Sequence, residues 1–219
     1  MIVTIHQPDF LPWLGFFERW RAGDLLIILD DVQFLRRGWH HRDKIKTPNG
    51  AQWLTVPIRK KALYSQKINT VQIDYSRDWQ KAFLETIRHS YSKAPNFTRT
   101  FQKIRTIIEQ NFTLLLDLNI ALLQYCASVL EITTPMVFAS EFNVTSRKTE
   151  RLVELVQAVN GTVYLTGMGS KDYLEEEEFS KAGIDVRWQQ FSDSPYPQLH
   201  GEYLEKLSVL DYLMMHPVQ

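Results

Sequence analysis

Three polar segments of this 219-residue sequence carry side chains that could move protons or bind phosphate. The first begins at His6, directly after the apolar run 2–5. An imidazole takes up or releases a proton near neutral pH, so His6 is a candidate general base or acid. The amide of the next residue, Gln7, is a candidate substrate contact. A structural role for His6, holding its loop through hydrogen bonds, stays open as the alternative.

The second segment begins at Asp30 and Asp31, which end an apolar run and precede Gln33. Successive residues of a strand point to opposite sides, so only one of the two carboxylates can face a given pocket. That carboxylate could orient His6 or a substrate hydroxyl or ammonium, while the other pairs with an arginine. Capping of the next turn would explain the same residues. The pair and His6 lack a metal-ligand spacing, so we predict no metal site.

The third segment follows the apolar run 163–166 and contains Gly167, Gly169, Ser170 and Lys171. Glycines two residues apart let the backbone approach a phosphate or carboxylate closely, and Ser170 or Lys171 could donate to a ligand oxygen. The spacing matches neither a Walker loop nor a complete dinucleotide fingerprint. A plain turn into a helix would use the same glycines, so both interpretations stay open.

A basic stretch with an aromatic residue, 36–46, stands in a chain whose formal net charge is zero. Within it, Trp39, Arg42 and Lys46 are candidate contacts for a phosphate, nucleotide or nucleotide-sugar, because guanidinium groups bind phosphate bidentately and indoles stack on rings. A solvated charged hairpin is the alternative. The neutral overall charge argues against a long nucleic acid as the main partner.

The elements that must position these segments follow from hydrophobic periodicity. Strands are predicted at 2–5, 25–29, 68–73, 136–138, 163–166 and 186–189. Helices are predicted at 12–21, 79–88, 97–109, 114–130, 149–159, 176–182 and 204–215. The turn signal Thr47-Pro-Asn-Gly50 predicts a hairpin within 34–57. We therefore predict an α/β fold: a mainly parallel sheet of about five strands flanked by helices, with a basic hairpin excursion and a helical middle section.

The predicted sheet would bring the three polar segments close together in space. In an open parallel sheet, ligands bind outside the carboxyl ends of the strands, where the strand order reverses. If the strands at 2–5, 25–29 and 163–166 are neighbours, the three polar segments share one edge. A small-molecule substrate, either a nucleotide-sugar or an acyl donor, is the expected partner.

Composition indicates a soluble globular chain with a single domain, 1–219, because 44% of the residues are hydrophobic and 23% are charged. The one cysteine, Cys126, lies in an apolar run; this excludes a disulfide framework and favours the cytoplasm. We find no signal peptide and no membrane span in the sequence. The aromatic run from Trp13 to Trp20 suits either the core or a homodimer interface. No particular cofactor is predicted.

Several motifs along nearly the whole chain form a recognisable pattern. They are Ile5-His-Gln-Pro-Asp-Phe-Leu-Pro-Trp-Leu-Gly-Phe-Phe17, Leu29-Asp-Asp-Val-Gln-Phe34, Trp39-x-x-Arg42, Ile45-Lys-Thr-Pro-Asn-Gly50, Tyr164-Leu-Thr-Gly167, Lys171-Asp-Tyr-Leu174, Tyr196-Pro-Gln198 and Leu207-Ser-x-x-Asp211. The pattern resembles the WbqC-like protein family. One position departs from it, since His41 stands where an asparagine is usual before the arginine.

The resemblance implies one WbqC-like α/β domain that acts in the cytoplasm in the biosynthesis of bacterial O-antigen, the polysaccharide of lipopolysaccharide, or of other surface polysaccharides. It further implies a transferase that modifies a nucleotide-activated amino sugar by acyl or aminoacyl transfer. In such a reaction His6 or Asp31 would take the amine proton, and Arg42 or the loop at Gly167 would hold phosphate or the developing oxyanion.

Two alternatives to this transferase remain open. One is a nucleotide-dependent adenylyl or nucleotidyl transfer enzyme, because nucleotidyltransferases and class I synthetases place a histidine-containing, glycine-ended motif after their first strand, where this chain has His6 to Gly15. The other is a non-catalytic binding protein of polysaccharide assembly.

Overall fold

The computed structural model describes residues 1–59 and 65–216. The chain separates into two compact units. The sheet unit comprises Met1–Gln7, Gly15–Asp31 and Ile132–Ser192, and the helical unit comprises Pro8–Leu14, Val32–Glu131 and Asp193–Gln219. Neither unit is a continuous stretch of chain, and a single domain over 1–219 remains a prediction.

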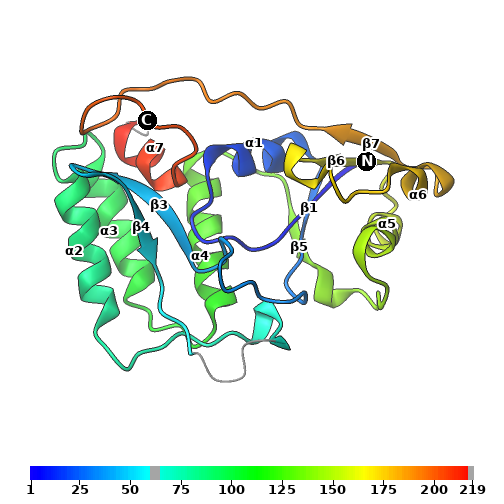
Figure 1. The fold of residues 1–219 in the computed structure, drawn as a ribbon, viewed down its shortest axis with the longest axis horizontal. Helices are drawn as coiled ribbons and strands as arrows, with labels where there is room; N and C mark the ends of the chain where they lie inside the picture. Colours follow the sequence, from blue (N-terminus) through cyan, green and yellow to red (C-terminus); the bar gives the residue numbers. More distant parts are fainter. Residues whose placement is uncertain (60–64, 217–219) are drawn as a thin grey trace. The chain divides into compact units, whose positions relative to one another are not determined.

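The sheet unit is built on a parallel sheet with the strand order β5-β2-β1-β6-β7 (Figure 1). Its strands are β1 (Ile2–His6), β2 (Leu25–Ile28), β5 (Met136–Phe138), β6 (Val163–Thr166) and β7 (Asp185–Trp188). All neighbouring pairs are parallel. The predicted α/β class and the five parallel strands are confirmed.

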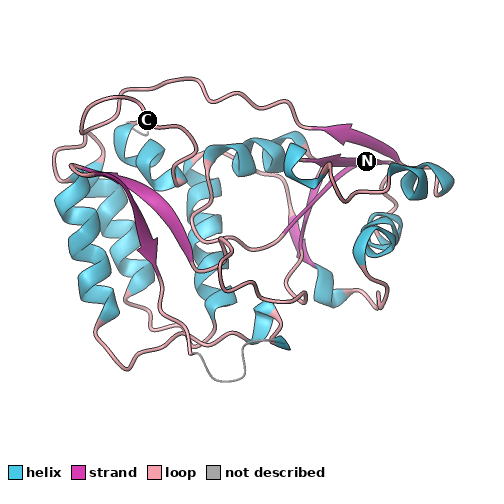
Figure 2. Ribbon diagram, in the orientation of Figure 1, coloured by secondary structure: helices cyan, strands magenta, loops and turns pink. Residues whose placement is uncertain are grey.

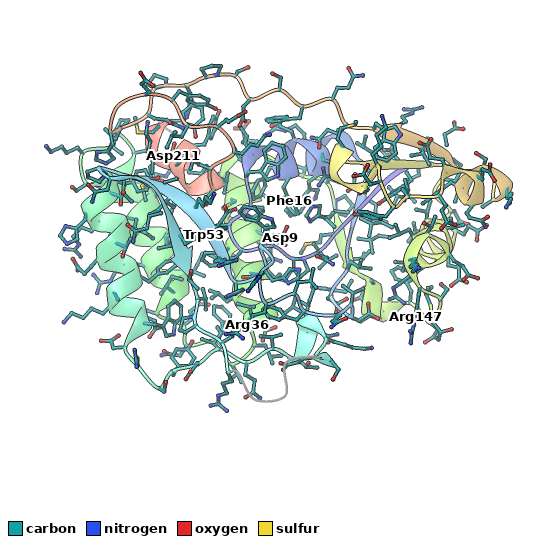
Figure 3. All side chains as sticks on the ribbon, in the orientation of Figure 1. Asp9, Phe16, Arg36, Trp53, Arg147 and Asp211 are labelled. Atoms are coloured by element: carbon teal, nitrogen blue, oxygen red, sulfur yellow. The ribbon has the colours of Figure 1, made fainter. Side chains whose placement is uncertain are left out.

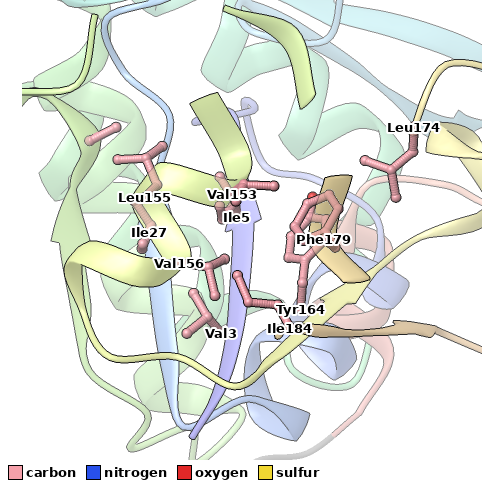
Figure 4. Close-up of a cluster of buried hydrophobic side chains, with 11 residues drawn as sticks. Val3, Ile5, Ile27, Val153, Leu155, Val156, Tyr164, Leu174, Phe179 and Ile184 are labelled. Atoms are coloured by element: carbon pink, nitrogen blue, oxygen red, sulfur yellow. The ribbon is translucent and has the colours of Figure 1, made fainter. Parts of the chain in front are cut away.

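Helices cover this sheet and complete its core. They are α1 (Leu14–Ala22), α5 (Lys148–Ala158) and α6 (Glu176–Lys181), with the short 3-10 helices η3 (Ala139–Glu141) and η4 (Met168–Ser170). Figure 4 shows side chains of α5, among them Val153 and Val156, facing Val3 and Ile5 of β1. The strands β2 and β6 are short apolar runs, as expected where a parallel sheet is covered on both faces, whereas the edge strand β7 alternates exposed and partly buried residues.

The helical unit contains most of the helical middle section and the hairpin (Figure 2). Its helices are α2 (Trp79–Tyr91), α3 (Phe97–Ile108), α4 (Leu115–Val129) and α7 (Val209–Met215). The hairpin strands β3 (Arg42–Thr47) and β4 (Gly50–Thr55) pair antiparallel and pack against α2. At the turn, Gly50 has φ +92°, a left-handed conformation that favours glycine. The predicted hairpin is confirmed.

One predicted strand is wrong. Residues 68–73 form the 3-10 helix η2 (Ile68–Thr70) followed by extended chain, with only isolated bridges at Gln72 and Ile73. The apolar residues of this segment are buried as the pattern requires, but among residues 1–59 and 65–216 no neighbouring strand forms a ladder with them. The local pattern therefore predicted correctly that these side chains are buried, but it wrongly predicted that the segment pairs with other strands in a sheet.

The last helix begins later than predicted. It starts at Val209 instead of residue 204, because the Ser208 side chain accepts a hydrogen bond from the backbone N–H of Leu210 and caps the helix there. Lys206 has φ +55°, so the chain is not helical at that residue. Among the helices within 1–59 and 65–216, none combines the length and the apolar character needed to cross a membrane.

Candidate functional site

The strand order of the sheet unit reverses between β1 and β6. From β1 the chain proceeds to β2 and then β5 on one side, and afterwards to β6 and β7 on the other side. His6 is the last residue of β1 and Thr166 the last residue of β6. We call the carboxyl ends of β1, β2 and β6, with the residues that follow them, the sheet edge. It is the place where an open parallel sheet binds its ligand.

His6 is half-buried at this edge. Its Nδ1 lies 2.9 Å from the carbonyl oxygen of Gln7, and its ring packs edge-on against Phe16 of α1 with centroids 4.7 Å apart. We assign the Nδ1–H tautomer from the first contact, since a carbonyl can only accept. Both ring contacts fix the direction of the imidazole, so His6 has a defined orientation at the sheet edge. Its role as a general base or acid stays a prediction.

The loop after β6 contains the four predicted residues of the third segment. A turn closes it, because the Ser170 N–H donates to the carbonyl oxygen of Gly167 at 3.1 Å. The Ser170 hydroxyl lies 3.2 Å from the hydroxyl of Thr166 and also accepts from Tyr173 at 3.2 Å. Gly169 and Lys171 are exposed. The loop therefore presents a backbone turn, a hydroxyl and an exposed ammonium at the sheet edge.

Arg19 of α1 was missed by the sequence analysis and lies at the same edge. Its Nη1 donates to Gln189 Oε1 at 2.8 Å, and Gln189 is anchored by its Nε2 on the Gly15 carbonyl and by its backbone N–H on the Thr166 carbonyl. The side chain is buried, and the Nη1 atom lies directly beside Gly167. A signal was present, since Arg19 falls three residues after Phe16 on the apolar face of a short helix.

The two aspartates at the end of β2 are engaged by the protein itself. Asp30 is buried and accepts a hydrogen bond from the Ser140 backbone N–H at 3.0 Å. Asp31 accepts from Arg151 Nη2 with both oxygens, at 2.7 and 2.8 Å, and Arg151 also donates to the Val144 carbonyl. This geometry holds the Asp31 carboxylate in place on Arg151, and a catalytic role for Asp31 stays a prediction.

The predicted residues Gln33, Trp39, Arg42 and Lys46 belong to the helical unit. Gln33 is exposed and forms an isolated bridge with Lys67. Trp39 is 46% exposed and its ring lies 5.2 Å from that of Trp53, which is 38% exposed and labelled in Figure 3. We call the set Trp39, Arg42, Lys44 and Trp53 the hairpin patch.

Cations complete the hairpin patch. The Arg42 guanidinium lies 4.3 Å from the centroid of the Trp53 ring, and the Lys44 ammonium lies 5.1 Å from it. Arg42 also donates to the Arg37 carbonyl at 3.1 Å. Exposed indoles with adjacent cations suit a planar ring that carries negative charge. The ligand contacts predicted for Trp39 and Arg42 stay a prediction.

Lys46 lies instead inside the helical unit. Its ammonium donates to Gln198 Oε1 at 3.1 Å, to the Gly201 carbonyl at 3.2 Å and to the Glu202 carbonyl. An ammonium has three donors, so these three acceptors use all of them. The backbone N–H of the same residue donates to the Tyr91 hydroxyl at 3.0 Å. Lys46 thus ties β3 to the segment 198–202.

A buried group of titratable side chains next to the hairpin patch was also missed. His40 and His41 are buried, and burial is the main cause that lowers the pKa of each to about 4; neighbouring His41 adds to the effect on His40, and Arg42 and Arg36 add to that on His41. Burial raises the pKa of Asp43 to about 8, against a backbone hydrogen bond from Lys44. Asp43 is therefore a protonated carboxylic acid at neutral pH, able to donate a proton.

Other contacts define this group further. His40 Nε2 lies 3.9 Å from an Asp9 carboxylate oxygen. Asn119 donates to the carbonyls of Pro8 and His40, both at 2.7 Å. The sequence analysis predicted that the basic stretch 36–46 either binds phosphate or forms a solvated charged hairpin, and the residue types of this stretch gave no signal that His40, His41 and Asp43 are buried. In the described ranges, no three His, Cys, Asp or Glu side chains are placed to hold a metal ion.

Comparisons with known proteins agree with the motifs. The model of the WbqC-like protein family matches residues 7–219. The uncharacterized protein Rv1507c of Mycobacterium tuberculosis is 35% identical over 213 residues, which cover 96% of this chain and 92% of that protein. No solved structure matches the chain. Since the family model and the relative both span nearly all of it, the chain belongs to the WbqC-like protein family.

Proposed function

We propose that the protein is a transferase of bacterial surface-polysaccharide biosynthesis, of the O-antigen type, that modifies a nucleotide-activated amino sugar by acyl or aminoacyl transfer. The observation that carries the proposal is the reversal of strand order between β1 and β6, with His6 at the end of one strand and the Gly167 loop at the end of the other. Membership of the WbqC-like family supports the link to polysaccharide.

The proposed reaction assigns a role to each group at the sheet edge. The amine nitrogen of the sugar attacks the carbonyl carbon of an activated acyl or aminoacyl ester, forming a C–N bond while the C–O bond to the leaving group breaks. His6 Nε2 takes the amine proton and returns it to the leaving oxygen. Donors of the 167–170 turn stabilise the negative charge on the carbonyl oxygen in the transition state.

The cytoplasm is the compartment that we propose for this reaction. Cys126 is a buried free thiol, and burial raises its pKa, so it stays protonated and unreactive. We also expect a homodimer. Size-exclusion chromatography with light scattering would check this expectation.

The test is a panel of nucleotide-activated amino sugars, each incubated with activated acyl and aminoacyl donors. We expect wild-type protein to form the amide product and His6→Ala to lose turnover by about 10²- to 10⁴-fold while it still binds the sugar nucleotide. Binding without turnover by wild-type protein would favour the non-catalytic binding protein. Absence of both binding and turnover across the panel would refute the proposal.

A nucleotide-dependent adenylyl or nucleotidyl transfer enzyme is the second candidate. It is favoured by one feature, the histidine that ends the central strand β1 immediately before the segment leading into α1. The likeness concerns the fold alone. ATP-dependent exchange of labelled pyrophosphate would separate the two candidates, because simple acyl transfer from a preformed ester produces no such exchange.

A further inference from the structure

The strand β7 has one side that its own sheet does not use. In the described part of the chain it is the last strand of the parallel sheet and pairs with β6 alone (Figure 1). The backbone N–H groups of Asp185 and Gln189 donate to carbonyl oxygens at the two ends of β6, at 3.0 and 2.7 Å. Because the direction of these groups alternates along a strand, those of Val186 and Trp188 point away from β6. We call this the free side of β7.

The free side of β7 can be reached from solvent. Asp185 and Arg187 are both exposed, and they lie on the same face of the sheet because they are two residues apart. A hollow of about 500 Å³ lies against the strand, lined by residues 183–187 together with Glu176 and Ser180 of α6. Among the described residues, none accepts a hydrogen bond from the Val186 N–H. The strand therefore still has donors and acceptors for a further strand.

The strand at the other end of the sheet, β5, is closed by the protein itself. It has only three residues, and the backbone N–H of its last residue, Phe138, donates to Glu141 Oε2 at 3.3 Å. A charged side chain on an end strand is a common way to prevent pairing with another chain. The free side of β7 is thus the better site for an added strand.

The charges on β7 are complementary to those of a second β7. Two copies related by a two-fold axis present the same strand to each other in antiparallel direction. If Val186 lies opposite Val186 of the second copy, their outward N–H and C=O groups can exchange two hydrogen bonds. In that register each Asp185 lies directly opposite an Arg187 of the other copy, which is a favourable cross-strand pair.

Other registers of the same pairing are unfavourable. A shift by two residues in one direction places Asp185 opposite Asp185, and in the other direction it places Arg187 opposite Arg187, and like charges directly opposite each other are destabilising. A shift by one residue would turn every side chain of one strand to the wrong face. The sequence of β7 therefore selects the register centred on Val186.

The aromatic run of α1 offers little surface to a second copy. Phe16, Phe17 and Trp20 are at most 3% exposed, so they belong to the core of one chain. The homodimer that we expect thus needs another surface, and β7 provides one with self-complementary charge.

We propose that the protein forms a two-fold symmetric dimer in which the β7 strands of two copies pair antiparallel, centred on Val186, and join two sheets into one. Two Asp185–Arg187 pairs flank the centre. A pairing of two short strands buries little surface, so we expect a dissociation constant on the order of micromolar. The inference does not depend on the proposed reaction.

The experiment is sedimentation velocity of the full chain over about 1 to 300 µM, which measures the dissociation constant of the dimer. Arg187→Asp places two aspartates opposite each other in both pairs, and Asp185→Arg does the same with two arginines. Each single variant should raise the dissociation constant by about 10- to 100-fold. The double variant with both substitutions restores opposite charges and should return to within about 3-fold of wild-type protein.

The matched control is Arg147→Asp, which makes the same charge reversal at an exposed position before α5 and should leave the dissociation constant unchanged. Circular dichroism of every variant checks that the fold is retained. Rescue by the double variant distinguishes pairing of β7 from a general effect of charge or folding, because the double variant alters both positions.

Three outcomes would overturn the inference. They are a wild-type protein that stays monomeric at every concentration, a dimer that neither single variant weakens, and a double variant that dissociates like the single variants. A monomeric wild-type protein would leave the free side of β7 to an extended segment of another protein. Amide formation is not part of the measurement, so failure of the proposed transferase reaction and failure of this inference are distinguishable.

Discussion

At the scale of single residues, the sheet edge separates groups that hold the fold from groups that can meet a substrate. Asp31 belongs to the first kind, because Arg151 holds both of its oxygens. His6 is proposed to belong to the second, since its ring is oriented by Gln7 and Phe16 while the residue is only half-buried. Residue type alone made both of them candidate bases, and their partners distinguish them.

The Asp31–Arg151 pair gives a prediction about stability. Asp31→Asn should lower the free energy of unfolding by about 3 kcal/mol, since the side chains are only 15% and 10% exposed and the change leaves a nearly buried guanidinium unpaired. Adding Arg151→Gln should recover part of the loss. Urea unfolding followed by circular dichroism measures both. A stable Asp31→Asn variant that has lost amide formation would instead support the catalytic role first predicted for Asp31.

At the scale of elements, the positions of strands and helices were largely predictable and the pairing of segments was not. The runs at 2–5, 25–29 and 163–166 formed strands, because short apolar segments bounded by turn residues are a local signal. The segment 68–73 has the same kind of pattern, but in the part of the chain that the structure describes it has no neighbouring strand. Pairing depends on residues far away in the sequence, which local periodicity does not contain.

The same limit of local sequence patterns decided which candidate site residues could be predicted from the sequence. His6 ends β1 and Gly167 follows the end of β6, so the general rule for parallel sheets predicted from the sequence that both lie at one edge. Arg19 and Asp43 are charged residues that packing buries; Arg19 had only the weak signal of its place on the apolar face of α1, and Asp43 had none. Their environment is created by distant segments, such as Gln189 for Arg19.

The segment 193–208 is an irregular stretch of chain that a single lysine helps to stabilise. It contains no regular helix or strand, yet Lys46 of β3 donates to Gln198 and to the carbonyls of Gly201 and Glu202. A further link to the same region is Tyr196, whose hydroxyl donates to Asp211 of α7 at 2.8 Å. These contacts replace the backbone ladder that a strand would have.

Lys46→Met should therefore destabilise the protein, by about 2 kcal/mol in urea unfolding, because buried acceptors lose their donor. The matched control is Lys44→Met on the same strand, whose ammonium lies over the Trp53 ring. It should cost less than about 1 kcal/mol. If Lys46→Met were as stable as wild-type protein and had lost only nucleotide-sugar binding, the direct substrate contact predicted from the sequence would be right.

At the scale of the whole molecule, pH acts on stability through the buried titratable group of the helical unit. His40 and His41 have pKa values of about 4 in the folded protein against an ordinary 6.5, so the unfolded chain binds the extra protons and stability falls as pH drops from 6.5 to 4. Asp43 has a pKa of about 8 against 3.8, so the folded protein binds the extra proton and stability falls as pH rises over that range.

Together these groups predict a stability maximum near pH 6.5. Below it two histidines outweigh one aspartate, and between pH 6.5 and 8 only Asp43 contributes. Each proton changes the free energy of unfolding by about 1.4 kcal/mol per pH unit. Asp43→Asn should remove the decline above pH 6.5 in a urea-unfolding series, whereas Asp117→Asn, at an exposed position of α4, should retain it. A decline that persists in Asp43→Asn would contradict the assignment.

The most direct test of ligand binding at the sheet edge is a titration of UDP-glucosamine into nitrogen-15-labelled protein, followed by the backbone amide shifts. We predict the largest shifts at Gln7, Gly167 and Ser170, which follow β1 and β6, and none at Gly161 and Gly183, which precede β6 and β7. Saturable binding that leaves the Gly167 amide unmoved, or that shifts mainly Gly161 and Gly183, would contradict the account.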